Sequence, residues 1–296
     1  MLEGLKNRRI AIAGAAMIAF AAVGIALAAG VNRSGPLGDG RALAVGEARQ
    51  AGLTVELPPA ISDRIYGAPQ AAGRPIVVID PGHGGSDPGA ISVSGEVSEK
   101  QLALELASEL RDKLVERGRV RVAMTRDDDR YLSLEQRAEV ARRTGASLFV
   151  SLHMDSAPNP LARGASIYSL SDVASDAEAA RFAESENRGI VAAEADGSVR
   201  SMLSDLAMRD QMVSSADFAT RVKSKSAGRF EMRPEPHRFA AFHVLRRADT
   251  PAVLFEAGYI SNADDELLLR TPEHRSAMVL ALAQAIEADV AVRSHR

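Results

Sequence analysis

The sequence predicts an α/β protein: a single domain with a mixed, largely parallel central sheet flanked by helices, plus a helical insert. Continuous apolar runs at 76–79, 147–152 and 251–255 are typical of strands buried on both faces of a parallel sheet. Alternating apolar residues at 120–124 and a further run at 165–170 predict two more strands. Helix signals stand between most of these runs, and strands that alternate with helices indicate the α/β class.

Three helices have clear start signals, two of them capping boxes. Ser98 with Gln101 opens a helix to about Gly118, and Ser133 with Gln136 opens a helix that ends at Gly145. Leucines at every fourth position from 102 to 114 give the first helix an apolar face. Thr271-Pro272-Glu273 begins the last helix, which we expect to reach about Val292, with proline at the first helical position.

The stretch 172–228 differs from the rest of the chain. Its apolar residues are mostly alanine, the strand pattern stops, and helices are predicted around 176–193, 200–213 and 215–226. We therefore expect one domain over 74–292, with this stretch as a helical insert.

The first residues predict export from the cytoplasm. Lys6, Arg8 and Arg9 precede an uncharged apolar run at 10–31, and Ala26-Leu27-Ala28 fits a cleavage site for a signal peptide. The run is also long enough to span a bilayer, so residues 1–31 fit either a cleaved signal or an inner-membrane anchor. Residues 32–73, rich in Gly, Pro and Ala, read as a linker. We expect the domain in the periplasm or cell envelope.

The amino-acid composition limits which partners and metal ligands the protein can have. The 296 residues carry a formal charge of −3, which gives no reason to expect nucleic acid as a partner. There is no cysteine, so disulfides and thiolate metal sites are excluded. A metal ion would have to be held by His, Asp or Glu.

Polar residues gather where the predicted strands end. His83, His153 and Glu256 each follow a buried strand, Asp80 ends the first one, and Glu99 opens the helix behind it. Two histidines and a carboxylate are the ligand set of a catalytic zinc ion, and a further carboxylate can act as general acid and base. Taken singly, each residue also fits an ordinary structural role, and no compact two-histidine helix motif is present.

Three motifs carry a family resemblance. They are Asp80-Pro-Gly-His83-Gly-Gly-Ser-Asp-Pro-Gly-Ala90 followed by Glu99-Lys100, Ser151-Leu-His153-Met-Asp155, and Pro251-Ala-Val-Leu-Phe-Glu256-Ala-Gly-Tyr-Ile-Ser-Asn262. In this order over about 75–292, they resemble the zinc-dependent N-acetylmuramoyl-L-alanine amidases of the amidase-3 family. Ala257 and Tyr259 stand where that family commonly has Thr and Phe, a difference expected to touch only the pocket wall.

The resemblance implies hydrolysis of the amide between N-acetylmuramic acid and L-alanine in peptidoglycan, for cell-wall remodelling and daughter-cell separation. It implies one zinc ion per chain on His83, Glu99 and His153, with Glu256 as the catalytic carboxylate. Glu96 is the competing ligand in the same loop. Asp80 and Asp155 are candidates to orient an imidazole from behind the metal ligands.

The insert suggests regulation. At helical spacing, Glu186 falls on an apolar face with Phe182 and Ile190, whereas Glu184 faces away. The division-associated amidases of this family have a helical insert that blocks the active site until an activator moves it. We therefore hypothesise that Glu186 closes the zinc site as an extra ligand, and we expect an activator of the degenerate metalloprotease type. A plain surface helix is the alternative.

Two other functions are compatible with parts of the sequence. A non-catalytic peptidoglycan-binding protein could keep this fold, but His83, Glu99, His153 and Glu256 are all present. A phosphate-handling enzyme would explain the glycine loop at 82–89. That loop lacks the lysine and serine or threonine of a nucleotide-binding loop.

Overall fold

The computed structural model describes residues 64–188 and 199–294, with only the backbone described in 199–205. These residues lie within one compact unit, Glu56–Arg296. The predicted signal or anchor at 1–31 lies outside the described residues, as does most of the predicted linker. Within 64–188 and 199–294, no helix is both long and apolar enough to cross a membrane.

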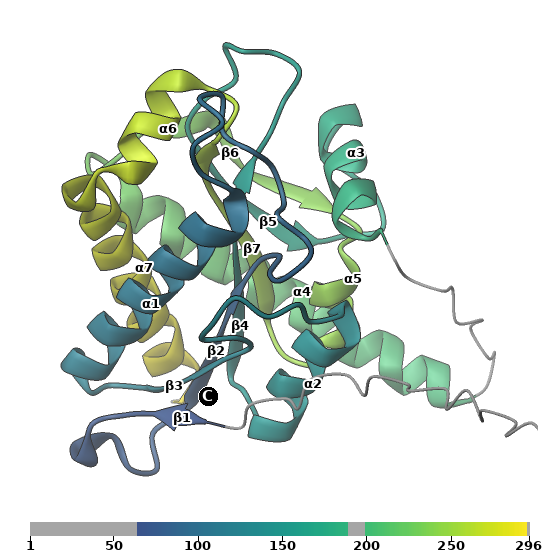
Figure 1. Cartoon of the computed structure of the whole chain (residues 1–296). Coiled ribbons are helices and arrows are strands. Elements are labelled where there is room, and N and C mark those ends of the chain that lie inside the picture. Colours follow the sequence, from purple (N-terminus) through teal and green to yellow (C-terminus); the bar gives the residue numbers. More distant parts are fainter. Residues whose placement is uncertain (1–63, 189–198, 295–296) are drawn as a thin grey trace, which may run out of the picture. The chain divides into compact units, whose positions relative to one another are not determined.

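A seven-stranded mixed sheet forms the centre of the domain, in the order β1-β3-β2-β4-β7-β5-β6 (Figure 1). The strands are β1 (Ile65–Tyr66), β2 (Ile76–Pro81), β3 (Arg121–Met124), β4 (Leu148–Asp155), β5 (Ala165–Leu170), β6 (Met232–Ala240) and β7 (Ala252–Tyr259). Strands β3, β2, β4 and β7 are parallel, β5 runs antiparallel to β7, and β6 is parallel to β5. The predicted fold class is confirmed.

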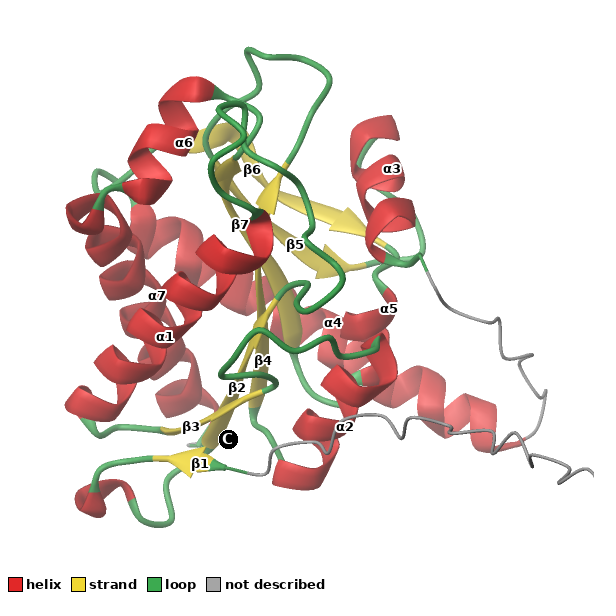
Figure 2. Ribbon diagram, in the orientation of Figure 1, coloured by secondary structure: helices red, strands yellow, loops and turns green. Residues whose placement is uncertain are grey.

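Helices cover both faces of this sheet (Figure 2). They are α1 (Glu99–Arg117), α2 (Leu134–Thr144), α3 (Ala177–Glu186), α4 (Val199–Ser226), α5 (His243–Arg247), α6 (Ala263–Arg270) and α7 (Pro272–Arg293), besides the short 3-10 helix η1 (Pro69–Ala71). One core layer joins the sheet to α1, α4 and α7. The second joins it to α2, α3 and α5.

The predicted helix signals are confirmed. Both capping boxes form, at Ser98 with Gln101 and at Ser133 with Gln136. Gly118 and Gly145 end these helices in the left-handed region, with φ of 65° and 60°. Such a C-cap favours glycine because it lacks a Cβ.

The structure differs from the sequence-based prediction in several places, among them the short helices α5 and α6, which were not predicted. Strand β6 was missed because Pro234 and Pro236 interrupt its pattern, and its position at the sheet edge explains how prolines are tolerated there. Helix α4 is one continuous helix where two were predicted, and its Phe218 and Val222 are fully buried in the core. Strand β1 pairs with β3, so the domain begins before residue 73, the predicted end of the linker.

Candidate metal centre

Three predicted ligands meet at one edge of the sheet. Strands β2 and β4 are parallel neighbours, so their carboxyl ends bring the His83 and His153 segments together. The Nε2 atom of His83 lies 3.0 Å from Oε1 of Glu99, and the Nδ1 atom of His153 lies 2.9 Å from the same oxygen. The side chains come from a loop, a helix start and a strand, and all three are largely buried.

His83 is held in an unusual backbone conformation. Its φ is +57°, in the left-handed region that side chains other than glycine rarely adopt. Its Nδ1 atom lies 2.9 Å from Oδ2 of Asp87, a hydrogen bond that fixes the ring orientation. The opposite nitrogen, Nε2, is buried and lies 3.0 Å from Oε1 of Glu99, but among the described residues it has no hydrogen bond of acceptable geometry. Backbone strain and a buried nitrogen without such a hydrogen bond both indicate a functional site.

Glu99 is fixed by the backbone around it. It is the first residue of α1, and its Oε2 accepts a hydrogen bond of 2.9 Å from the Ala90 amide. Its Oε1 accepts one of 3.1 Å from the Met154 amide. Burial by itself would raise the pKa of Glu99, but the two imidazoles beside it hold that pKa below its usual value.

The electrostatic environment favours a cation. Burial alone would lower the pKa of His83, yet Glu99, Asp87 and Glu186 raise it to about 11. The same concentration of negative charge that would keep an extra proton on His83 attracts a divalent metal ion. Imidazole nitrogens and carboxylate oxygens are the ligands that zinc prefers in a protein without cysteine.

Glu186 reaches the same point from α3. Its Oε2 lies 3.7 Å from Nε2 of His83 and 3.5 Å from Nδ1 of His153. These three residues form a group whose ligand atoms lie within 4.8 Å of one another. Glu184 is exposed on the same helix, whereas Ile190, predicted to share the apolar face of Glu186, lies outside the described residues.

Glu256 lies within β7, directly opposite His153 on β4 and Ser166 on β5. Its side chain is fully buried, and both carboxylate oxygens lack a hydrogen-bond partner in the described part of the chain. Burial raises its pKa well above the ordinary value, and the nearby charges of Asp155, Glu99 and Glu186 add to that. A carboxyl group in this environment is suited to holding and releasing a proton.

A cavity of about 810 Å³ opens beside these residues. Its walls include His83, Glu99, His153 and Asp155 from the sheet side, and Phe182 and Glu186 from α3. Helix α3 therefore forms one wall of the cavity that holds the candidate metal ligands.

Three further predictions on site residues can be placed. Asp80 does not contact an imidazole: its carboxylate bonds Thr125, Arg137 and Ser151. Asp155 accepts a hydrogen bond from the Ser156 amide, and burial raises its pKa to about 7, but within 64–188 and 199–294 it forms no hydrogen bond or ion pair with an imidazole. Asp87 is the carboxylate that orients His83, because it lies on the same glycine turn.

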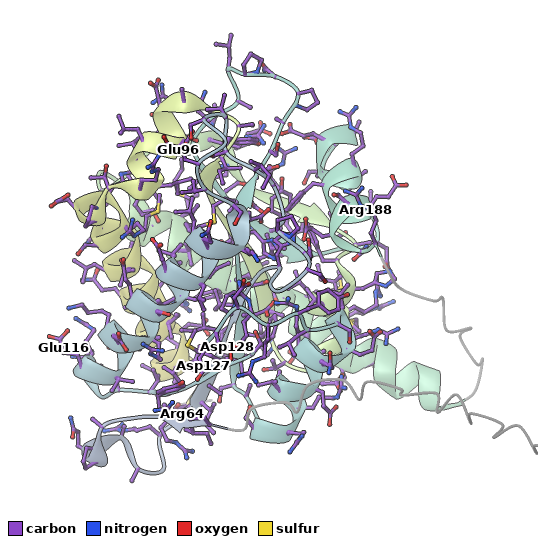
Figure 3. The ribbon with its side chains drawn as sticks, in the orientation of Figure 1. Arg64, Glu96, Glu116, Asp127, Asp128 and Arg188 are labelled. Atoms are coloured by element: carbon purple, nitrogen blue, oxygen red, sulfur yellow. The ribbon has the colours of Figure 1, made fainter. Side chains whose placement is uncertain are left out.

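Glu96, the competing ligand, points away from the site. It lies on the surface beside α6, where its carboxylate pairs with Arg270 at 2.7 Å (Figure 3). The structure therefore brings Glu99 and not Glu96 to the two histidines.

The sequence of the chain is similar to those of known peptidoglycan amidases. The sequence profile of the Amidase_3 family, described as N-acetylmuramoyl-L-alanine amidase, matches residues 77–288. The chain is 35% identical over 225 residues to the N-acetylmuramoyl-L-alanine amidase AmiA of Escherichia coli, a match covering 74% of this chain and 77% of AmiA. It is 32% identical to AmiC of Escherichia coli, covering 80% of this chain and 58% of AmiC.

The fold is also similar to those of solved N-acetylmuramoyl-L-alanine amidases. The N-acetylmuramoyl-L-alanine amidase AmiC2 of Nostoc punctiforme superposes with a TM-score of 0.56 at 26% identity, over 76% of this chain and 99% of AmiC2. The amidase of Clostridium difficile 630 gives a TM-score of 0.55 at 25% identity, over 73% of this chain and 96% of that chain.

Proposed function

Because the chain belongs to the amidase-3 family of N-acetylmuramoyl-L-alanine amidases, we propose that it cleaves the amide between N-acetylmuramic acid and L-alanine in peptidoglycan with one zinc ion per chain. The observation that carries this proposal is the convergence of His83 and His153 on the Glu99 carboxylate. His83, Glu99 and His153 would hold the ion. A zinc ion bound there supplies Lewis acidity, which polarises a carbonyl group and lowers the pKa of water.

Glu256 is the residue that we propose moves the proton. Water adds its oxygen to the carbonyl carbon of the muramyl lactyl group, and Glu256 takes the proton that this water loses. As the C–N bond breaks, Glu256 passes the proton to the alanine nitrogen, so the products are a muramyl carboxylic acid and a stem peptide with a free amine. The buried position and unpaired oxygens of Glu256, opposite His153, support this role.

Helix α3 is proposed to keep the enzyme inactive at rest. Glu186, the last residue of α3, lies within 3.7 Å of both imidazoles and would occupy the position that water and substrate need. Phe182 adds an apolar contact, with its ring 5.3 Å from that of Tyr168 and 5.4 Å from that of Phe242.

Both ends of α3 are tied to the domain. At its start, Glu178 bonds Arg233 at 2.8 Å and the Tyr259 hydroxyl at 2.9 Å. At its end, the Asn187 side chain donates to the Ala241 carbonyl at 2.7 Å and accepts from the His243 amide at 2.8 Å. Partly exposed contacts of this kind are individually weak, so a binding partner could release the helix.

An activator protein is the partner that we propose for this arrangement. We propose one of the degenerate metalloprotease type, acting during daughter-cell separation, on the basis of the family resemblance. The N-terminal sequence at 1–31 supports export to the periplasm or cell envelope, either with removal of that segment or with membrane association through it.

Purified sacculi provide the test. Wild type, Glu256→Gln and Glu186→Ala are incubated with zinc or with chelator, and the soluble products are identified by mass spectrometry. We expect free stem peptides and peptide-free glycan from the Glu186→Ala protein with zinc, and none from Glu256→Gln. Substitutions are preferable to removing residues 172–228, because Phe218 and Val222 of α4 belong to the core.

The rival function is a non-catalytic peptidoglycan-binding protein. It would bind sacculi without releasing peptides, even as the Glu186→Ala variant loaded with zinc. Products that keep the bond between muramic acid and alanine would also refute the amidase.

A further inference from the structure

Arg126 is a fully buried cation next to the candidate metal centre. It follows β3, in a segment whose charges predict a solvated loop at 126–130, yet its side chain is 0% exposed. Four backbone carbonyl oxygens accept its hydrogen bonds: Pro81 at 3.0 Å, Gly82 at 2.7 Å, Lys100 at 2.9 Å and Asp128 at 3.0 Å. Asp128, labelled in Figure 3, lies in the loop that follows β3.

These acceptors belong to the segments that carry the ligands. Pro81 and Gly82 directly precede His83, and Lys100 directly follows Glu99 in the first turn of α1. The Nη2 atom of Arg126 donates to both Gly82 and Lys100. One guanidinium group therefore ties the His83 loop to the helix start that presents Glu99.

A second buried arginine completes the arrangement. Arg137 donates to the Pro81 carbonyl at 2.7 Å and to the His83 carbonyl at 2.6 Å, and it pairs with Asp80 at 2.8 Å. The carbonyls of three consecutive residues, 81 to 83, thus each accept from a guanidinium group. This explains how the left-handed conformation of His83 is maintained against its conformational cost.

Burying the Arg126 guanidinium costs free energy of folding. Burial, together with the positive charge of Arg137, lowers the pKa of Arg126 to about 10. Burying a cation among neutral acceptors carries a desolvation penalty that a paired carboxylate would reduce. Arg117 has such a partner, because it forms a bidentate pair with Glu287 away from the site.

We propose that Arg126 is a positioning residue for the metal centre: it sets the separation between the His83 loop and the first turn of α1, so that His83 and Glu99 reach one ion. The inference rests on the proposed function in taking zinc as that ion. A lysine at 126 would keep the charge but not the planar fork that bridges two carbonyls.

Metal affinity of the full chain is the test. Zinc affinity of wild type and Arg126→Lys is measured by competition with a chromophoric chelator, and the cobalt-loaded proteins are compared by their visible absorption. We expect affinity about 10-fold or more weaker in the variant, the range found for residues that orient metal ligands, and an altered cobalt spectrum.

Arg293→Lys is the matched control. Arg293 also donates to a backbone carbonyl, that of Ser147, and it pairs with Asp289. Ser147 directly precedes β4, whereas His153 lies near the other end of that strand. Its replacement should lower stability without changing zinc affinity or the cobalt spectrum. If Arg126→Lys behaves in the same way, Arg126 is merely structural and the inference is wrong.

Two further outcomes can be distinguished from a failure of this inference: a variant that does not fold, and a failure of the proposed function. If Arg126→Lys does not fold, Arg137→Lys is measured instead, because Arg137 shares the Pro81 carbonyl with Arg126 and also holds the His83 carbonyl. Unchanged zinc affinity in that variant overturns the inference. If wild type binds zinc but releases no peptide from sacculi, even with Glu186 replaced, the proposed function fails while the positioning role of Arg126 stands.

Discussion

Gly82 and His153 are in direct contact across the ends of β2 and β4. A methyl group added to Gly82 would lie 2.4 Å from Cε1 of the His153 imidazole, much closer than the approximately 3.5 Å at which carbon atoms normally meet. The Gly82 amide also donates to the Leu152 carbonyl at 3.0 Å, so the two segments cannot separate without losing a hydrogen bond. The missing side chain at Gly82 is what lets His153 face Glu99.

Gly82→Ala is therefore expected to displace the imidazole. We predict a loss of zinc affinity of more than about 10-fold, since the change acts directly on a proposed ligand. Overpacking should also lower the free energy of unfolding by about 1–3 kcal/mol. Chelator competition and urea unfolding of the purified protein measure the two effects.

Gly67→Ala controls for crowding alone. Its methyl group would meet the Arg121 side chain at 3.1 Å, at the start of β3, whereas the site lies at the carboxyl ends of β2 and β4. We expect its zinc affinity to be unchanged. Equal affinities for Gly82→Ala and wild type would show that the contact with His153 does not matter.

The regular part of the fold could be predicted because its signals are local. Buried apolar runs locate β2, β4 and β7, and the capping boxes at Ser98 and Ser133 locate α1 and α2. Strand β6 could not be predicted, since it depends on a long-range pairing with β5 that its two prolines disguise. The continuity of α4 likewise depends on tertiary packing.

In the site, residues at strand ends could be predicted, but the groups that support them could not. His83, Glu99 and His153 lie together as expected, because parallel strands end at one edge. The charges at 126–130 predict a loop, and they do not reveal that backbone carbonyls surround a buried Arg126. The role of Asp87 follows only from the shape of the glycine turn.

Replacing Glu186 tests the closed state. If its carboxylate blocks the site, Glu186→Ala should raise basal peptide release from sacculi about 5-fold or more, the lower range of a regulatory coupling free energy. Glu184→Ala, on an exposed position of the same helix, is the control and should not change the rate. Equal rates of peptide release by the two variants would show that Glu186 does not inhibit the enzyme.

The hydroxyl of Tyr259 is expected to contribute to the closed state that we propose. It donates to Glu178 at 2.9 Å and also contacts Arg233. Tyr259→Phe removes a hydrogen bond worth about 1 kcal/mol, which corresponds to about a 5-fold larger open population and the same rise in basal release.

Tyr66→Phe provides a matched loss of a hydroxyl. Its hydroxyl donates to Asp127 at 2.8 Å in the loop after β3, which Figure 3 shows away from α3. Basal release should stay at the wild-type rate. A rise in this variant too would mean that lower stability, and not release of α3, increases activity.

The attachment of α3 should weaken in acid because of Glu178. The hydrogen bond from Arg233 is the main effect that lowers the pKa of Glu178 to about 2, from an ordinary value of 4.5; burial opposes it and Tyr259 adds to it. A pKa lowered by folding contributes stability that is complete above pH 4.5 and is lost as the pH falls toward 2. Glu178→Gln cannot titrate, so the difference in unfolding free energy between wild type and this variant isolates the effect. Urea unfolding between pH 2 and 7 should show that difference shrinking below pH 4.5. A difference independent of pH would mean that the ion pair with Arg233 contributes nothing to holding the helix.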